Sequence, residues 1–439
     1  MHVSVSLKIR RGGPVIRPIE VVLVGAGNRG ERTFGAYALD QPDRMKIVGV
    51  AEPDAIKRER FATAHSIPPE NVFEMWEDLM ARPQLAPALI NTTMDRTHVD
   101  STLVALDAGY DVLLEKPMAA SATDCVRIVE AAENAGRMLQ ICHVLRYTSF
   151  FRELKVLLDS GALGDIVTVE HTEHVAYWHM AHSYVRGNWR NADHATPMLL
   201  SKSCHDLDIL VWMLGRRCKR VTSFGALRHF RPENAPSGAP DRCTDGCPAE
   251  SECPYYAPRL YLELLGDSPL AGSISMDPSL EGRLQALREG PYGRCVYRCD
   301  NNVVDHQVLI IEFEGDTTVS FTVQGHSHDN VRTMRYSGTR ATVRGHSGLN
   351  ELTLHDYVSG TEERLSPGLV EGGHGGGDSG LLNAFVDAVR GNGTTETSAR
   401  NSLESHLIGY AAEEARFTGT VVDMDEYRAR IYAAAGVVV

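Results

Sequence analysis

The chain has 439 residues and a formal net charge of −13. This length exceeds what one ordinary hydrophobic core organises, so two domains are expected. The acidic balance argues against nucleic acid or an anionic membrane surface as a partner, and no apolar stretch approaches the roughly 18 residues of a spanning helix. Residues 1–16 lack the apolar core of a signal peptide and predict a disordered lead-in.

A glycine-rich turn near the start is the strongest local signal. Residues 21–24 form a continuous apolar run, typical of a strand buried on both faces, and Gly25, Gly27 and Gly30 follow at G-x-G-x-x-G spacing before a predicted helix over 31–39. The first glycine permits the tight bend, the second lets the backbone approach a pyrophosphate, and the third lets helix and strand pack closely. The pattern predicts a dinucleotide site at a helix start.

A second apolar run, residues 47–51, ends at Glu52, 22 positions after Gly30. An acid about 20 residues beyond the glycines holds the ribose hydroxyls of NAD. The carboxylate would repel the 2′-phosphate of NADP, so NAD is expected, although Lys57 and Arg58 lie close in sequence. The predicted cofactor-binding residues are Gly25, Gly27, Asn28, Arg29, Gly30, Glu52, Thr92, His98, Glu115 and Lys116.

Strands and helices continue to alternate up to about residue 143. Strands are predicted over 86–91, 111–114 and 138–142, and helices over 97–108 and 121–135. Repeated β–α units of this length predict a doubly wound parallel sheet, that is, a Rossmann domain over 17–143.

The pattern changes in the second domain, residues 144–439. Long strand patterns joined by short turns predict an α/β domain with a large open, mainly antiparallel sheet and helices on one face. A Cys- and Pro-rich insert is expected at about 231–300, and the glycine-dense segment 372–380, with His374, predicts a mobile loop near a ligand. Strands are predicted over 166–177, 221–229, 303–313, 318–324, 333–336 and 341–344, and helices over 199–214, 379–390 and 398–417.

Lys116 is the first catalytic candidate. The strand that ends at Leu114 delivers Glu115, Lys116 and Pro117 to the crevice where parallel sheets bind ligands. Pro117 restrains Lys116 to an extended conformation. A partly buried lysine can exchange a proton with a hydroxyl, although many lysines after strands are simply surface residues.

His205 is the second catalytic candidate. On a helix over 201–212, His205 and Asp208 share one side, so Asp208 could orient or charge-stabilise the imidazole. Histidine is the usual general acid–base near neutral pH. The structural alternative is a histidine that caps or fills a helix beside a core.

Residues 171–184 are dense in histidine and aromatic side chains, and Trp189 and Arg190 follow. Aromatic faces with hydrogen-bonding rims suit sugar rings, so this stretch predicts a substrate wall. A metal interpretation of His179 and His182 lacks a carboxylate partner at fixed spacing. The substrate candidates are Arg146, Tyr147, His182, Trp189, Arg190, Lys202, Asp208 and His374.

The nine cysteines are an odd count. Without an export signal, they favour reduced thiols and a cytoplasmic protein. Cys243, Cys247 and Cys253 lie close together in the insert and predict either a structural zinc site or merely buried thiols.

Several motifs in this order carry a family resemblance: the glycine turn, Glu115-Lys116-Pro117-Met118, Arg146-Tyr147 and the segment from His205 to Asp208. Together they resemble the Gfo/Idh/MocA oxidoreductases of sugars and cyclitols. The resemblance implies a nicotinamide bound between the two domains, Lys116 and His205 near the reacting carbon, and an open sheet used for dimerisation, hence a homodimer or homotetramer.

One position departs from the inositol-dehydrogenase-like pattern, which has an aspartate four residues before the histidine. Here that residue is Ser201. Lys202, with Arg146, Arg186 and Arg190, could instead present positive charge to an anionic sugar.

Three functions stay open. The first is an NAD-dependent oxidoreductase that transfers a hydride between a sugar or cyclitol carbinol and the nicotinamide. The second is a redox-neutral glycosidase that oxidises the sugar, eliminates the aglycone, adds water and reduces the ketone with the same NAD. The third is a non-catalytic sugar sensor.

Overall fold

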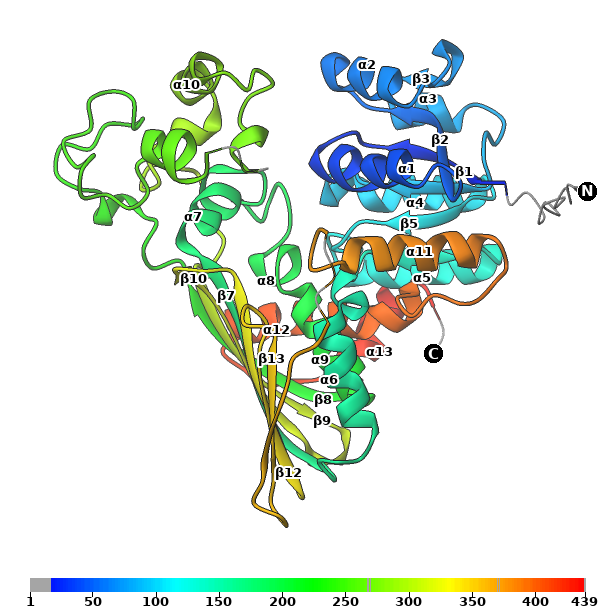
Figure 1. The fold of residues 1–439 in the computed structure, drawn as a ribbon, viewed down its shortest axis with the longest axis vertical. Coiled ribbons are helices and arrows are strands. Elements are labelled where there is room, and N and C mark those ends of the chain that lie inside the picture. Colours follow the sequence, from blue (N-terminus) through cyan, green and yellow to red (C-terminus); the bar gives the residue numbers. More distant parts are fainter. Residues whose placement is uncertain (1–16, 267, 269, 369, 371, 438–439) are drawn as a thin grey trace, which may run out of the picture.

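The structure, a computed structural model, describes residues 17–266, 268, 270–368, 370 and 372–437. Two sheets organise the chain, one parallel and one mostly antiparallel (Figure 1). The lead-in predicted for residues 1–16 lies outside the described residues. None of the described helices is long and apolar enough to cross a membrane.

The first sheet has six parallel strands in the order β3-β2-β1-β4-β5-β6. Its central strand β1 is buried on both faces, with residues 21–24 at most 2% exposed, because crossover helices cover both sides of such a sheet. The predicted Rossmann sheet is confirmed. Its strands are β1 (Ile19–Val24), β2 (Met45–Ala51), β3 (Val72–Phe73), β4 (Ala88–Asn91), β5 (Asp111–Leu114) and β6 (Leu139–Ile141).

Local capping rules explain the best-defined helix of this part. Ser121 caps α5, accepting a hydrogen bond from the Asp124 amide (3.1 Å), and Gly136 ends it at φ +60°, as expected for N-cap serine and C′ glycine. The helices are the π-helical turn Gly30–Gly35 with α1 (Ala36–Asp40), α2 (Ala55–Ala64), α3 (Trp76–Met80), α4 (His98–Asp107) and α5 (Ala122–Ala135).

The second sheet has nine strands in the order β14-β13-β12-β11-β7-β10-β9-β8-β15. Only β7 and β10 pair in parallel, so the predicted mainly antiparallel sheet is confirmed. Its strands are β7 (Ile166–Ala176), β8 (Cys218–Ala226), β9 (His306–Phe313), β10 (Thr318–Ser327), β11 (Val331–Gly338), β12 (Ala341–His346), β13 (Glu351–Asp356), β14 (Glu362–Leu365) and β15 (Val422–Asp423).

Helices cover one face of this sheet, and α12 also packs against α5 of the first part (Figure 1). On the opposite face, Phe224 is 71% and Ile310 49% exposed. The helices are α6 (Ser149–Asp159), α7 (Tyr177–His179) with the π-helical turn Met180–Arg186, α8 (Met198–Ser201), α9 (Cys204–Leu214), α10 (Leu280–Glu289), α11 (Gly377–Val389), α12 (Ala399–Thr418) and α13 (Met424–Ala434).

The single helix predicted over 199–214 is wrong, because the chain breaks between α8 and α9. The Ser201 carbonyl, which an unbroken helix would offer to the amide of residue 205, accepts a hydrogen bond from the Lys116 ammonium (2.6 Å). The Ser203 hydroxyl donates to Glu173 (2.7 Å). Tertiary partners therefore replace helical hydrogen bonds at this point.

The described part of residues 227–305 contributes no strand to either sheet. It has a small core of its own, which includes Leu260, Tyr261 and Leu287. Met276 reaches the first part of the chain, with Sδ 3.8 Å from Arg60 Nη1 on α2. The insert therefore contacts a helix of the first part of the chain, although it lies within the second part.

Candidate functional site

The glycine turn has the geometry of a dinucleotide cradle. Gly25 has φ +92°, and a Cβ there would lie 2.7 Å from the Thr92 carbonyl oxygen. A Cβ on Gly30 would lie 2.1 Å from the Gly25 carbonyl oxygen, whereas one on Gly27 would meet no atom within 4 Å. Gly25 and Gly30 are thus required by the fold, while Gly27 leaves open space where a pyrophosphate approaches. Asn28, the next residue, is exposed.

Glu52 is held beside this turn. Its carboxylate accepts hydrogen bonds from the Ala26 amide (2.6 Å) and the Asp54 amide (3.0 Å). Neither neighbouring cation is paired with this carboxylate: Lys57 lies 3.5 Å from Asp54, and Arg58 donates to the backbone carbonyls of Glu52 (2.5 Å) and Pro53 (3.0 Å). An acid fixed at the end of β2 fits the ribose of NAD, so the turn and this acid together suit that cofactor.

Arg29, in the glycine turn, is held by two carboxylates. Its guanidinium forms ion pairs with Glu115 (2.6 Å) and Asp378 (2.9 Å). Burial lowers the pKa of Arg29, but these two carboxylates outweigh the burial and raise it. The glycine turn is therefore bonded both to the end of β5 and to the start of α11.

The Lys116–Pro117 peptide is cis and is anchored from two sides. His98 places Nδ1 2.8 Å from the Pro117 carbonyl oxygen and Nε2 3.1 Å from that of Thr93. The Met118 amide donates to His406 Nε2 (2.9 Å). His98, predicted to bind cofactor, thus supports the segment that carries Lys116, and its ring nitrogens are both engaged.

Lys116 joins the two parts of the chain. Its ammonium donates to the Ser201 carbonyl (2.6 Å) and lies 5.9 Å from the ring centre of Trp189. His205 follows four residues after Ser201, and the Lys116 charge is among the causes that lower the His205 pKa. The two predicted catalytic side chains therefore meet where the first sheet's strand ends face α9.

His205 is only 6% exposed. Its Nδ1 is buried without a hydrogen-bond partner among the residues that the structure describes, whereas Nε2 is not fully enclosed. Burial is the largest cause that lowers its pKa well below 6.5, followed by the charge of Lys116 and by His143 and His374. The imidazole is therefore neutral at pH 7 and able to accept a proton.

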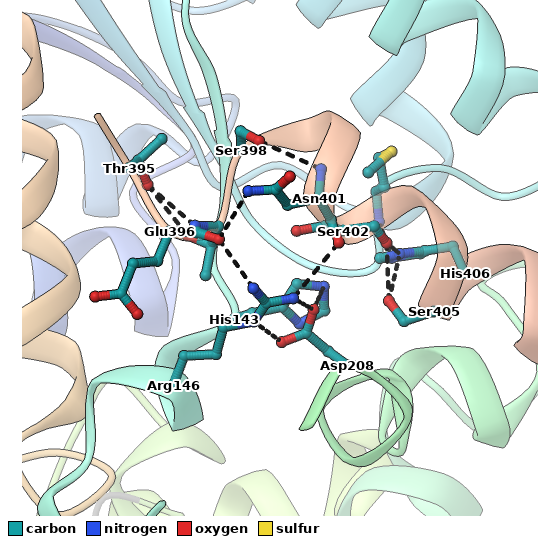
Figure 2. A network of polar contacts seen from close by, with 12 residues as sticks. His143, Arg146, Asp208, Thr395, Glu396, Ser398, Asn401, Ser402, Ser405 and His406 are labelled. Atoms are coloured by element: carbon teal, nitrogen blue, oxygen red, sulfur yellow. Dashed lines mark hydrogen bonds and ion pairs between the residues drawn. The ribbon is translucent and has the colours of Figure 1, made fainter. Parts of the chain in front are cut away.

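The expectation that Asp208 directly orients or charge-stabilises His205 is not met, because the Asp208 carboxylate is paired with Arg146. Asp208 forms a two-bond ion pair with Arg146, with Oδ2 2.7 Å from Nε and Oδ1 2.6 Å from Nη2 (Figure 2). Arg146 also donates to the Glu396 carbonyl (2.9 Å), and Tyr147 lies beside Thr395 and Thr397. These buried residues connect α9 to the segment before α12.

Three of the four cations proposed to bind an anionic sugar are engaged with other residues of the protein. Arg146 is paired as above, Arg186 is fully buried and donates to the Arg294 and Tyr255 carbonyls, and Arg190 is paired with Asp300 (2.7 Å). The remaining cation, Lys202, lies 3.1 Å from Glu173. Each of the four cations therefore already has a partner within the protein.

A buried charge network that the sequence did not predict holds Lys202. Arg332 donates to Asp206 and to Glu173 (2.6 Å), and Glu173 also accepts from Ser203. The signal in the sequence is present but ambiguous, because alternating polar residues on a strand such as β7 predict a half-exposed face. Here Glu173 is 1% exposed, because Lys202, Ser203 and Arg332 bond to its carboxylate.

The remaining substrate candidates, Trp189 and His182, contact different parts of the protein. Trp189 lies near Lys116 and donates to Asp95 (3.3 Å). His182 instead stacks on Tyr292 of the insert, with ring centres 4.6 Å apart. The aromatic stretch thus partly supports the insert rather than forming one continuous wall.

The glycine-dense segment brings His374 to the site. The His374 ring centre lies 6.2 Å from that of His205, and its Nδ1 lies 3.0 Å from Asp378. Because Asp378 also binds Arg29, His374 is connected to the glycine turn through one carboxylate. A residue distant in sequence therefore lies beside the proposed base.

The cysteine cluster does not form a metal site. Among the described residues, no three His, Cys, Asp or Glu side chains are placed to hold a metal ion, so the zinc predicted at Cys243, Cys247 and Cys253 is not supported. Cys243 lies 3.6 Å from the guanidinium of Arg186. That cation occupies space beside the thiol that a metal would need.

A glycine turn, a strand-end acid and a second sheet beyond them define a two-part dinucleotide-binding protein. The family model described as "Oxidoreductase family, NAD-binding Rossmann fold" matches residues 19–143, and "Oxidoreductase family, C-terminal alpha/beta domain" matches residues 155–424. The chain therefore belongs to the Gfo/Idh/MocA family of oxidoreductases.

Three individual proteins to which this chain is similar are between 16% and 31% identical to it over the aligned residues. The putative oxidoreductase YteT of Bacillus subtilis is 25% identical over 391 residues, 82% of this chain and 87% of that protein. Inositol 2-dehydrogenase 4 of Saccharopolyspora erythraea is 31% identical over 238 residues, 51% of this chain and 62% of that protein. Levoglucosan dehydrogenase, solved with NADH and levoglucosan, has a TM-score of 0.70 at 16% identity over 93% of this chain and 100% of that one, a likeness that shows the fold.

The Gly27→Ala variant tests the cradle. It should fold as the wild type does, because its methyl group meets no protein atom within 4 Å, yet weaken NAD binding by about tenfold or more, because the methyl group enters the pyrophosphate's space. Calorimetric titration with NAD and thermal melting measure the two effects. Gly368→Ala, at an exposed position where a Cβ likewise meets no atom within 4 Å, is the control, and unchanged NAD affinity in Gly27→Ala would contradict the assignment.

The buried neutral histidines predict loss of stability in mild acid. Burial lowers the pKa of His406 to about 3 and those of His143 and His205 well below 6.5. Between these values and 6.5 the unfolded chain binds more protons, so the unfolding free energy should fall as pH drops below 6.5, by at most about 1.4 kcal/mol per pH unit for each histidine. Urea unfolding at pH 7.5 and 5.5 measures this, and equal stability at both pH values would be the contrary result.

Proposed function

We propose that this protein is an NAD-dependent dehydrogenase of a neutral sugar, sugar derivative or cyclitol. The observation that carries the proposal is the bond from Lys116 to the Ser201 carbonyl, which brings an ammonium and a neutral imidazole together beside the glycine turn. This pair suits removal of the proton from a hydroxyl. The names of relatives, inositol 2-dehydrogenase and levoglucosan dehydrogenase, support a polyhydroxylated ring as the substrate class.

Each side chain has a distinct part in this proposal. His205 Nε2 accepts the proton of the substrate hydroxyl. Lys116 keeps two further N–H donors beyond its bond to Ser201, and these hold the same oxygen as negative charge develops on it. The nicotinamide supplies the hydride acceptor, while the chain's own residues position the carbinol and exclude water.

The charge balance favours a neutral substrate. Glu173 is 3.1 Å from the Lys202 ammonium and also binds Arg332, so Lys202 is already compensated. Its remaining N–H groups can bind sugar hydroxyls as neutral-ligand donors. The fixed Glu52 carboxylate favours NAD over NADP, because a 2′-phosphate beside it would meet like charge.

One observation favours the redox-neutral glycosidase as a second candidate. Met276 of the insert contacts Arg60, and a Cβ on Gly272 would lie 3.0 Å from the Arg32 guanidinium. Both arginines belong to the cofactor-binding part, on the π-helical turn Gly30–Gly35 and on α2. An insert that bridges to these elements would retain a dinucleotide through a full oxidation and reduction cycle.

One assay separates these functions. The protein is offered free cyclitols, free sugars and aryl glycosides with NAD+ or NADP+. Steady NADH formation is expected with a free polyol, and Lys116→Met should lower kcat by about 100-fold or more because the oxygen loses its charged donor. Aglycone release without NADH would favour the glycosidase, and binding without either product would favour the sensor.

We further propose a cytoplasmic homo-oligomer. All nine cysteines are free thiols, which fits a reducing compartment. Phe224, Val308 and Ile310 are exposed side chains on adjacent strands β8 and β9, where Phe224 pairs with Val308. An apolar row on an open sheet suits a second copy of the chain.

Ile310→Lys tests this arrangement. Light scattering of the wild type should give a mass of two or four chains, and the variant should give one chain, because an ammonium would be buried at the interface. Ile56→Lys, at a 64% exposed position on α2, should leave the mass unchanged. A wild type of single-chain mass would contradict the proposal.

A further inference from the structure

We propose that His143 is a positioning residue for His205. In this arrangement Nε2–H of His143 faces the Asp208 carboxylate, and one enclosed water joins His143 to Nδ1 of His205. The inference rests on the proposed role of His205 as the base. It supplies the orienting group that neither Ser201 nor Asp208 provides directly.

The first argument is burial without partners. His143 is 0% exposed, and neither of its ring nitrogens has a hydrogen-bond partner among the described residues. Nδ1 of His205 is buried and unpartnered as well. A buried donor or acceptor left unpaired costs about 1–3 kcal/mol, so three such nitrogens on two neighbouring rings indicate a shared polar partner.

The second argument is the placement of the rings. The ring centres of His143 and His205 are 5.7 Å apart at an interplanar angle of 79°, and no direct hydrogen bond joins them. On its other side, His143 Nε2 lies 3.8 Å from Asp208 Oδ1, and Figure 2 shows both residues beside Arg146. His143 therefore lies between a fixed carboxylate and the proposed base.

The alternatives near His205 are already engaged. His406 also lies beside His143, with ring centres 5.4 Å apart. However, its Nε2 accepts from the Met118 amide (2.9 Å), so its Nδ1 carries the proton and donates to the Ser402 carbonyl (2.9 Å). The Ser201 hydroxyl donates to the Pro197 carbonyl (3.2 Å). Neither residue can orient the His205 ring without losing its own bond.

The charges and hydrogen bonds then fit one set of tautomers. Asp208 accepts two bonds from Arg146 and lies 3.8 Å from Nε2 of His143, so in the proposed arrangement the His143 proton lies on Nε2, facing this carboxylate. Nδ1 of His143 accepts from the water, and the water accepts from Nδ1–H of His205. This places the lone pair of His205 on Nε2, the nitrogen that takes the substrate proton. The positive charge formed there is stabilised by the water, by the His143 dipole and by the Asp208 carboxylate that faces His143, and no other group gains or loses a proton.

A crystal structure of the NAD-loaded enzyme tests the geometry independently of turnover. Electron density for one water is expected within about 2.6–3.2 Å of a ring nitrogen of both His143 and His205. Density bonded to only one ring, or none, would overturn the proposal. This measurement stands even if no substrate is turned over.

Two variants of similar size test the consequence. His143→Leu removes the partner of the enclosed water, so kcat should fall by about 10–100-fold with little change in KM, and thermal melting checks that the variant is folded. His143→Gln keeps a donor and an acceptor and should recover part of kcat. A Leu variant with wild-type kcat, or a folded Gln variant that recovers none of the lost kcat, would overturn the proposal.

The pH profile of kcat gives the last readout. The charged and titratable groups that face His205 are Lys116, His143, His374 and Arg332, and those that face His143 include Arg146, Lys116, Asp208 and His406. In the His143→Leu variant, the acidic limb of the pH profile of kcat should shift along the pH axis. If His143 plays no part in orienting His205, this limb should stay where it is in the wild type. A wild type inactive as a dehydrogenase refutes the proposed function, while an active wild type with an unaffected Leu variant refutes only this inference.

Discussion

The hydrogen bond from the Lys116 ammonium to the Ser201 carbonyl (2.6 Å) links the end of β5 to the break between α8 and α9. The break frees that carbonyl, because an unbroken helix would have used it for an amide. The bond also fixes the ammonium near His205. If it were absent, the two proposed catalytic groups would belong to separate elements with no direct connection between them.

Buried ion pairs surround this contact. Arg146 with Asp208, Arg332 with Asp206 and Glu173, and Arg29 with Glu115 and Asp378 each tie one element to another. Such pairs contribute little net stability because desolvation offsets their attraction. They do penalise alternative arrangements strongly, since a separated partner would be a buried unpaired charge. Their effect here is to fix which elements meet at the site.

Local sequence rules explain why much of the fold was predictable. The glycine spacing, the acid at the end of β2, and the capping residues Ser121 and Gly136 each act within one β–α unit. The break before α9 was missed because the residues that cause it, Lys116 and Glu173, are far away in sequence. Asp208 was assigned to His205 for the same reason, because helical spacing says nothing about Arg146 on another element.

By itself the sequence determined the two sheets, the dinucleotide cradle and the identity of Lys116 and His205 as candidates. Their signals are periodicity and spacing, which are set by the backbone geometry of single strands and helices. Only the tertiary structure decided which charges are free to meet a ligand, and it brought His143 and Glu173 to the site. Pairing between distant side chains depends on how helices and sheets pack against one another, and no local pattern records that packing.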